Sequence, residues 1–354
     1  MIALNNLKNL KKSKYAVALL FVLLVILGMV WFKSEEAAKK AKNIYYLKIG
    51  TVLADNDPIV AGLELMAKKV ESDTDGNVII EVYASSELGD PVDLLKKAKD
   101  GANVGIILDT GALAEYVPDM GIYSAPYVFS SLANARKFIE TPIFKKWDDE
   151  LAALGLRDLS CNWYQGTRNF ISNKKIERLS DLEGLSVRTM ESAVARYGMR
   201  AFGAAPTSLP WVYVYSGLKN KTIDAVEVQA AAAYGASLYK VAKYCAVTEH
   251  FLLYTSLVVS ESWFQSLPDE YKASLLARSK ESGDFATKLT LTREADFNND
   301  MRNKGMVFIK VDKKPFIKAS HALYKHMNWH DLKAQIDSAL GQNPWDSPTI
   351  ERLF

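Results

Sequence analysis

The sequence predicts a two-lobed α/β fold with a cleft between the lobes and one long helix that spans both. Three observations lead to this prediction. Strand and helix patterns alternate along most of the chain. About 310 residues follow the N-terminal segment, which exceeds the size of a typical single hydrophobic core. A long helical stretch interrupted only by Gly283 lies in the C-terminal third.

The first lobe begins with three strand patterns separated by two helical patterns. Residues 45–50, 78–83 and 104–108 are rich in β-branched and aromatic side chains, which favours strands. Pro58 opens an amphipathic helix that continues to residue 70, and Pro91 opens another that ends near Gly101. A β-α-β-α-β order predicts a largely parallel sheet.

The second lobe repeats the alternation. We expect strands near 185–189 and 222–226, and helices at 192–202 and 211–218. No repeat of fixed period is present.

The remaining elements link and close the lobes. Residues 251–260 form an apolar strand, and Leu267-Pro-Asp-Glu opens the long helix, which ends near Asn303. A strand at 306–311 and helices beyond Lys314 follow. The predicted organisation is a targeting segment and spacer at 1–43, a first lobe at 44–165 completed by about 251–290, a second lobe at 166–250 completed by about 291–340, and a tail at 341–354.

The N-terminus predicts export from the cytoplasm. Four lysines (Lys8, Lys11, Lys12 and Lys14) precede an unbroken apolar run at 15–32. The run approaches the length of a membrane span and lacks a small-residue cleavage site, which favours an uncleaved anchor over a cleaved signal peptide. The lysines place the N-terminus in the cytoplasm, so the rest of the chain is expected to be periplasmic or extracytoplasmic.

Charge excludes a nucleic-acid partner. Of the 44 basic residues, four lie in residues 1–32, which leaves 40 basic against 41 acidic residues in the rest of the chain. No basic face with interleaved aromatic residues is present. The two cysteines, Cys161 and Cys245, could be free or joined in an exported protein, and their spacing does not decide between these states.

The sequence does not predict an enzyme, a cofactor or a metal site. Gly-rich phosphate loops and a G-x-S-x-G nucleophile motif are absent. His326 and His330 have the i,i+4 spacing of a metal pair and His321 lies nearby, but no cysteine or intervening acidic residue completes a ligand set.

Two arginines carry the functional prediction. Arg188 ends the run Gly184-Leu-Ser-Val-Arg188 at a strand end, and Arg168 lies in Tyr164-Gln-Gly-Thr-Arg168. A guanidinium is always charged, and its planar fork matches two carboxylate oxygens. In a two-lobed α/β protein, a ligand is expected at the carboxyl ends of the strands.

Several spaced motifs resemble one family, the solute-binding proteins of tripartite ATP-independent periplasmic (TRAP) transporters, of the C4-dicarboxylate-receptor type. The resemblance covers about residues 45–300. The motifs are Thr74–Gly89, Asp119–Phe129, the Arg168 and Arg188 segments, Gly203–Thr207 and Ser262–Pro268.

The resemblance implies a periplasmic-binding-protein-like fold and a set of ligand contacts. Arg188 would form the salt bridge to a ligand carboxylate, and Arg168 would assist from the same lobe. Trp211 would line the pocket, and Gln229 would supply an amide where many members have an asparagine. On the first lobe, the loops that follow its strands offer two further candidates, Asn56 and Thr110.

The implied function is an extracytoplasmic receptor that delivers an organic acid to a sodium-driven permease of two membrane subunits, without ATP. Asp90-Pro-Val92 stands where sialic-acid binders have an arginine, which disfavours that ligand. Dicarboxylates, sugar acids, hydroxy or keto acids and aromatic acids remain open. The alternative function is a membrane-tethered organic-acid sensor that signals to a receptor or kinase.

Overall fold

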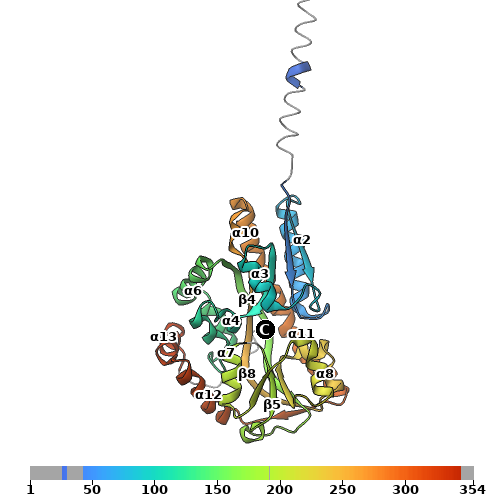
Figure 1. The fold of residues 1–354 in the computed structure, drawn as a ribbon, viewed down its shortest axis with the longest axis vertical. Coiled ribbons are helices and arrows are strands. Elements are labelled where there is room, and N and C mark those ends of the chain that lie inside the picture. The colour runs from blue at the N-terminus through green and yellow to red at the C-terminus, as the bar shows by residue number, and fades with distance from the viewer. Residues whose placement is uncertain (1–25, 30–42, 191, 344–354) are drawn as a thin grey trace, which may run out of the picture. The chain divides into compact units, whose positions relative to one another are not determined.

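The computed structural model describes residues 26–29, 43–190 and 192–343, and the described residues from Tyr45 onward form one compact unit (Figure 1). Most of the predicted anchor at 15–32 and most of the predicted tail at 341–354 lie outside the described residues. Among the helices that are described, none has the length and apolar character needed to cross a membrane.

The described strands join in one sheet with the order β2-β1-β3-β8-β4-β7-β5-β6, and β9 adds to β8. Their bounds are β1 Tyr45–Gly50, β2 Val78–Tyr83, β3 Val104–Asp109, β4 Leu156–Ser172, β5 Ser186–Thr189, β6 Ala205–Ser208, β7 Ala225–Val228, β8 Tyr244–Ser260 and β9 Val307–Lys310. In Figure 1, β4 and β8 run through the middle of the unit. Helices α2 (Pro58–Asp73) and α3 (Pro91–Lys99) lie toward one end, and β5 and helix α8 (Val214–Lys219) lie toward the other.

The sheet is mixed rather than largely parallel. Within each predicted lobe the pairs are parallel: β1 with β2 and β3, and β5 with β6 and β7. The long strands β4 and β8 pair with each other, and with β7 and β3 respectively, in antiparallel fashion. The sequence prediction missed β4 altogether, and it also missed β6 and the first half of β8. Almost all of β4 is buried, so it carries no alternating pattern of apolar and exposed polar residues.

The predicted helix starts at Pro58 and Pro91 are confirmed, and both carry a chemical signal. Asp57 and Asp90 accept hydrogen bonds from Ile59 N and Val92 N, which caps α2 and α3, and a proline occupies the first turn of each. The described helices are α2 Pro58–Asp73, α3 Pro91–Lys99, α4 Thr110–Leu113, α5 Leu132–Phe138, α6 Pro142–Ala153, α7 Ala193–Ala201, α8 Val214–Lys219, α9 Ala230–Gly235, α10 Glu261–Gln265, α11 Asp269–Asn303, α12 Lys314–His326 and α13 His330–Leu340, with 3-10 turns at Pro118–Ser124, Leu179–Leu182, Trp211–Tyr213 and Leu238–Lys240.

Helix α11 is the predicted long helix, and it contacts α2, β4 and α9. It therefore touches elements of both predicted lobes. Near its middle, Gly283 lies so close to Asn162 of β4 that a Cβ atom would come within 2.5 Å of the amide oxygen. In its C-terminal half, the Phe297 ring packs at 5.3 Å from the Tyr234 ring of α9.

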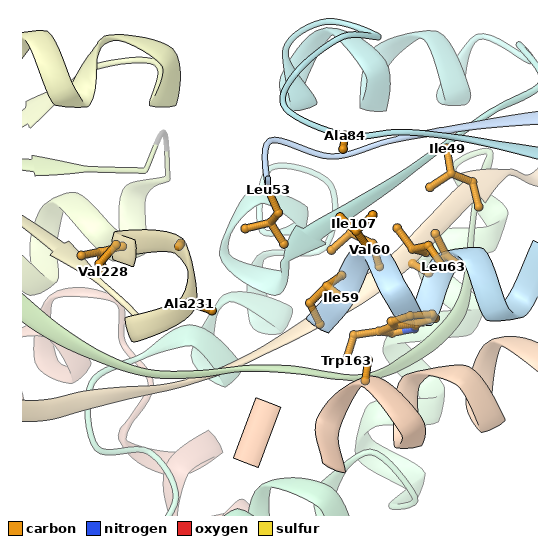
Figure 2. Close-up of a cluster of buried hydrophobic side chains, with 14 of the residues drawn as sticks. Ile49, Leu53, Ile59, Val60, Leu63, Ala84, Ile107, Trp163, Val228 and Ala231 are labelled. Atoms are coloured by element: carbon orange, nitrogen blue, oxygen red, sulfur yellow. The ribbon is translucent and has the colours of Figure 1, made fainter. Parts of the chain in front are cut away.

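The buried core beneath α2 holds this helix against the sheet. Figure 2 shows Ile59, Val60 and Leu63 of α2 gathered with Ile107 of β3 and Trp163 of β4. All five side chains are buried. Cys161 and Cys245 are both buried and free, which answers the question that the sequence left open.

Gly62 provides a test of the packing between α2 and α11. A Cβ atom on Gly62 would lie 2.8 Å from Ala286 Cβ and 2.9 Å from Trp163 Cζ3. We therefore expect Gly62→Leu to lower the free energy of unfolding by roughly 1–3 kcal/mol through overpacking. Urea denaturation followed by circular dichroism measures this change. Glu64→Leu, on the exposed face of the same helix, is the matched control, and equal stability of the two variants would contradict the packing described.

Candidate functional site

A cavity of about 630 Å³ opens at the carboxyl ends of β1, β3, β5 and β7, with the middle of β4 and β8 at its base. Its walls come from both predicted lobes. One wall is built from residues between Val52 and Pro118, and the other from residues between Arg188 and Ala232. The volume falls in the range of roughly 300–1,000 Å³ that is usual for small-molecule sites.

Arg168 is a fixed cation in the base of this cavity. Its side chain is 4% exposed and forms an ion pair with the carboxylate of Glu227 on β7, which is fully buried. Arg168 Nη2 also donates to the main-chain oxygen of Glu227 at 2.8 Å, and Nη1 lies 3.1 Å from Met190 Sδ. The strand register shifts between Tyr164 and Gly166 and again after Arg168, and such irregularities change the direction in which a strand's side chains point.

Burial dominates the electrostatics of Glu227. Desolvation raises the pKa of this carboxyl to about 7, although Arg168 and Arg188 both favour its charged form. Asp109, at the end of β3 on the opposite wall, is also buried, and desolvation raises its pKa against the attraction of Arg168. The charge of the cavity is therefore sensitive to protonation of two carboxyl groups.

Arg188 lies on β5 in the second wall and is 6% exposed. Its Nε donates to the main-chain oxygen of Leu209 at 2.8 Å, and its Cζ lies 5.4 Å from the centre of the Trp211 ring. These two contacts hold the planar guanidinium in one orientation at the cavity. Arg188 and Trp211 are brought together as neighbours, and both line the cavity.

A chain of side-chain hydrogen bonds crosses the base of the cavity. Gln229 Nε2 donates to Gln165 Oε1 at 2.8 Å, and Gln165 Nε2 donates to Thr255 Oγ1 at 3.2 Å. Thr255 in turn donates to the main-chain oxygen of Trp163 at 2.8 Å. All three polar side chains line the cavity and are buried, so their orientation is fixed by one another.

Of the six predicted site residues, Arg168, Arg188, Trp211 and Gln229 line this one cavity. The two first-lobe candidates lie elsewhere. Thr110 is fully buried and shares a hydrogen bond of 2.8 Å with the Ser124 hydroxyl. Asn56 is exposed beside α11, and its main-chain oxygen accepts from Arg293 Nη1 at 3.2 Å.

Sequence reasoning did not identify several polar residues of the lining, among them Asp109, Gln165 and Arg196. Asp109 directly precedes the predicted Thr110, so the correct strand end was found but the neighbouring side chain was chosen. Gln165 was hidden because β4 itself was not predicted. Arg196 lies in the second turn of α7, which begins at the cap Ser192, four residues after Arg188.

In the part of the chain that the structure describes, no three His, Cys, Asp or Glu side chains gather in a way that could hold a metal ion. His326 packs against Tyr197 instead, with the ring centres 3.8 Å apart. The fourth histidine, His250, is fully buried between aromatic rings, and burial holds its pKa well below the usual value.

Comparison with known proteins identifies the family. Residues 49–330 match the bacterial extracellular solute-binding protein family 7, DctP. The 2,3-diketo-L-gulonate-binding periplasmic protein YiaO of Escherichia coli (strain K12) is 24% identical over 295 residues, which cover 83% of this chain and 88% of YiaO.

Two solved structures extend the comparison to the fold. A TRAP periplasmic solute binding protein from Escherichia fergusonii, in an apo open form, is 35% identical with a TM-score of 0.74, covering 83% of this chain and 99% of that one. A TRAP periplasmic solute binding protein from Ochrobacterium anthropi with bound L-fuconate is 27% identical with a TM-score of 0.81, covering 84% and 99%. The chain therefore belongs to the bacterial extracellular solute-binding protein family 7, a family of two-lobed α/β solute receptors rather than enzymes.

Proposed function

We propose that this protein is the receptor of a TRAP transporter and binds an organic acid whose carboxylate docks on Arg188. The observation that carries the proposal is the orientation of Arg188, which Leu209 and Trp211 hold at the wall of a 630 Å³ cavity. A preoriented guanidinium offers a carboxylate two parallel hydrogen bonds without further ordering of the side chain.

The base of the cavity supports binding of an anion. Arg168 adds a second buried guanidinium, and Glu227 fixes its position. Removal of either side chain would leave the other charge buried without a partner, which is strongly destabilising. Arg168 thus contributes a positive field beneath the ligand, while Arg188 makes the direct contact.

A sugar acid is the ligand class that the surroundings favour. Gln165, Gln229 and Thr255 offer amide and hydroxyl groups for hydroxyl recognition, and Trp211 offers an apolar face. The L-fuconate of the Ochrobacterium anthropi protein and the 2,3-diketo-L-gulonate named for YiaO are both polyhydroxylated carboxylates. We therefore do not restrict the ligand to a C4-dicarboxylate.

Delivery to a membrane permease completes the proposal. The two walls of the cavity come from different predicted lobes, so a ligand that contacts both favours a closed arrangement through contacts that are absent when the lobes are apart. The closed form is the state that a sodium-driven permease of two membrane subunits would recognise. Residues 1–32 would direct export and tether the receptor to the membrane.

Truncation of Arg188 tests the carboxylate contact. We expect Arg188→Ala to weaken binding of a sugar acid by roughly 2–5 kcal/mol, about 30-fold to several thousand-fold, because the carboxylate loses its charged partner. A thermal-shift screen of aldonic, aldaric, keto and dicarboxylic acids, with neutral sugars and amino acids as controls, selects the acid, and calorimetry measures its affinity.

Arg178→Ala is the matched control, because the Arg178 side chain is 80% exposed and lies outside the cavity. The control variant should bind as the natural sequence does. An affinity that changes less than threefold in Arg188→Ala, or a response to neutral sugars alone, would contradict the proposed function.

The pH dependence of binding tests the role of Glu227. Because burial raises its pKa to about 7, the carboxyl is mostly protonated at pH 6 and mostly charged at pH 8. Protonation removes a negative charge beside Arg168, so an acid ligand should bind more tightly at pH 6, by up to roughly tenfold. Calorimetry at both pH values measures this ratio. Binding that is weaker at pH 6 would contradict the assignment, and Glu227→Gln should flatten the profile.

Protonation of Glu227 also changes the free energy of unfolding, in a direction that its pKa fixes. The folded-state pKa of Glu227 lies above the ordinary value of 4.5, so the folded protein binds more protons than the unfolded chain between about pH 4.5 and 7. The contribution of Glu227 to the free energy of unfolding is therefore fully present below pH 4.5 and is lost as the pH rises through 7. The melting temperature of Glu227→Gln should depend less on pH across this window.

A further inference from the structure

A third arginine lines the cavity, and its surroundings differ from those of the other two. Arg196 lies in the second turn of α7 and is half-buried. Within the described residues, its side chain makes no hydrogen bond, ion pair or ring contact. By contrast, the next arginine on this helix, Arg200, is exposed and stacks on Tyr197 at 5.2 Å.

The acidic residues of the cavity that the structure describes do not pair with Arg196. Asp90 accepts a hydrogen bond from Val92 N at 2.9 Å and so caps α3. Glu115 is exposed on the opposite wall and, among the residues described, forms no ion pair with Arg196. Glu227 and Asp109 interact with Arg168. A half-buried guanidinium at the wall of a cavity, with no anionic partner among the described residues, is available to an anionic group of a ligand.

We infer that the ligand carries a second anionic group, which Arg196 binds while Arg188 holds the first. The inference rests on the proposed function, because it assumes a carboxylate at Arg188, and it narrows the ligand from an organic acid to a dianion. The two arginines lie on consecutive elements of one wall, β5 and α7, and both line the cavity, so a ligand that is acidic at both ends could engage the two guanidinium groups together. An aldaric acid and an aldonate phosphate both have this chemistry.

Matched acids that differ at one end test the inference. D-Gluconate, D-glucarate and 6-phospho-D-gluconate share a six-carbon chain, and D-galactonate and galactarate form a second set. Calorimetry on the full chain in detergent should give an affinity at least tenfold higher for a diacid or phosphate than for its monoacid partner. Preference for glucarate or galactarate identifies a carboxylate as the second group, and preference for 6-phosphogluconate identifies a phosphate.

The variant Arg196→Met keeps the length of the side chain and removes its charge. It should lower the affinity for the dianion about tenfold and leave the affinity for the monoacid within twofold, which removes the preference. Arg196→Lys should restore part of the preference because the charge returns without the planar fork. Arg200→Met, on the exposed face of the same helix, should change neither affinity.

Three outcomes overturn the inference. One is the absence of any preference for dianions in the natural sequence, whether the monoacids bind equally well or no acid of the set binds. Another is an equal loss for monoacid and dianion in Arg196→Met. The third is an equal loss for both ligands in Glu115→Gln, which would assign Arg196 to an ion pair between the two walls. If the monoacids bind the natural sequence and Arg188→Ala abolishes that binding, the proposed function stands and only the dianion is rejected.

Discussion

The hydrogen-bond ladder between β4 and β8 is the constraint on which the rest of this structure depends. The two strands run antiparallel from the Leu156–Ser260 pair to the Ser172–Tyr244 pair, and the other described strands join one of them either directly or through a neighbouring strand. Their middle portions form the base of the cavity. Irregularities in register occur on both sides of Arg168, where the regular alternation of side chains is interrupted and polar groups reach the cavity.

The pairing of β4 with β8 and the strand ends beside it fix the positions of the charged side chains in the cavity. Arg168 comes from β4 and Glu227 from β7, its neighbour in the sheet, so their ion pair is set by strand pairing rather than by flexible loops. Arg188 is placed by β5, and the backbone at Leu209 holds its guanidinium. A site on rigid strands keeps its donors in position before a ligand arrives, which reduces the ordering cost of binding. The opposite wall then completes the contacts.

Local signals in the sequence explain what could be predicted. Helix starts in the first lobe were found from Pro58 and Pro91, each of which follows an aspartate N-cap. The continuous apolar pattern of 104–108 identified a buried strand. Strand β4 could not be predicted, because it is buried along almost its whole length and its register is irregular, both of which remove the alternation expected of a strand. Because β4 was not predicted, Gln165 was not recognised as a residue of the site. The roles of Arg188, Arg168, Trp211 and Gln229 were predicted from the resemblance to a known family. Asn56 and Thr110 were chosen from loops alone, where nothing local fixes a side-chain direction.

A crystal structure with the acid that gives the largest thermal shift tests the central claim most directly. The account predicts one ligand carboxylate in bidentate contact with the Arg188 guanidinium, at about 2.8 Å between nitrogen and oxygen atoms. Both walls of the cavity would contact the ligand, and Trp211 would lie against its carbon chain. A ligand carboxylate that faces solvent, or that lies outside the cavity and away from Arg188, would contradict the account.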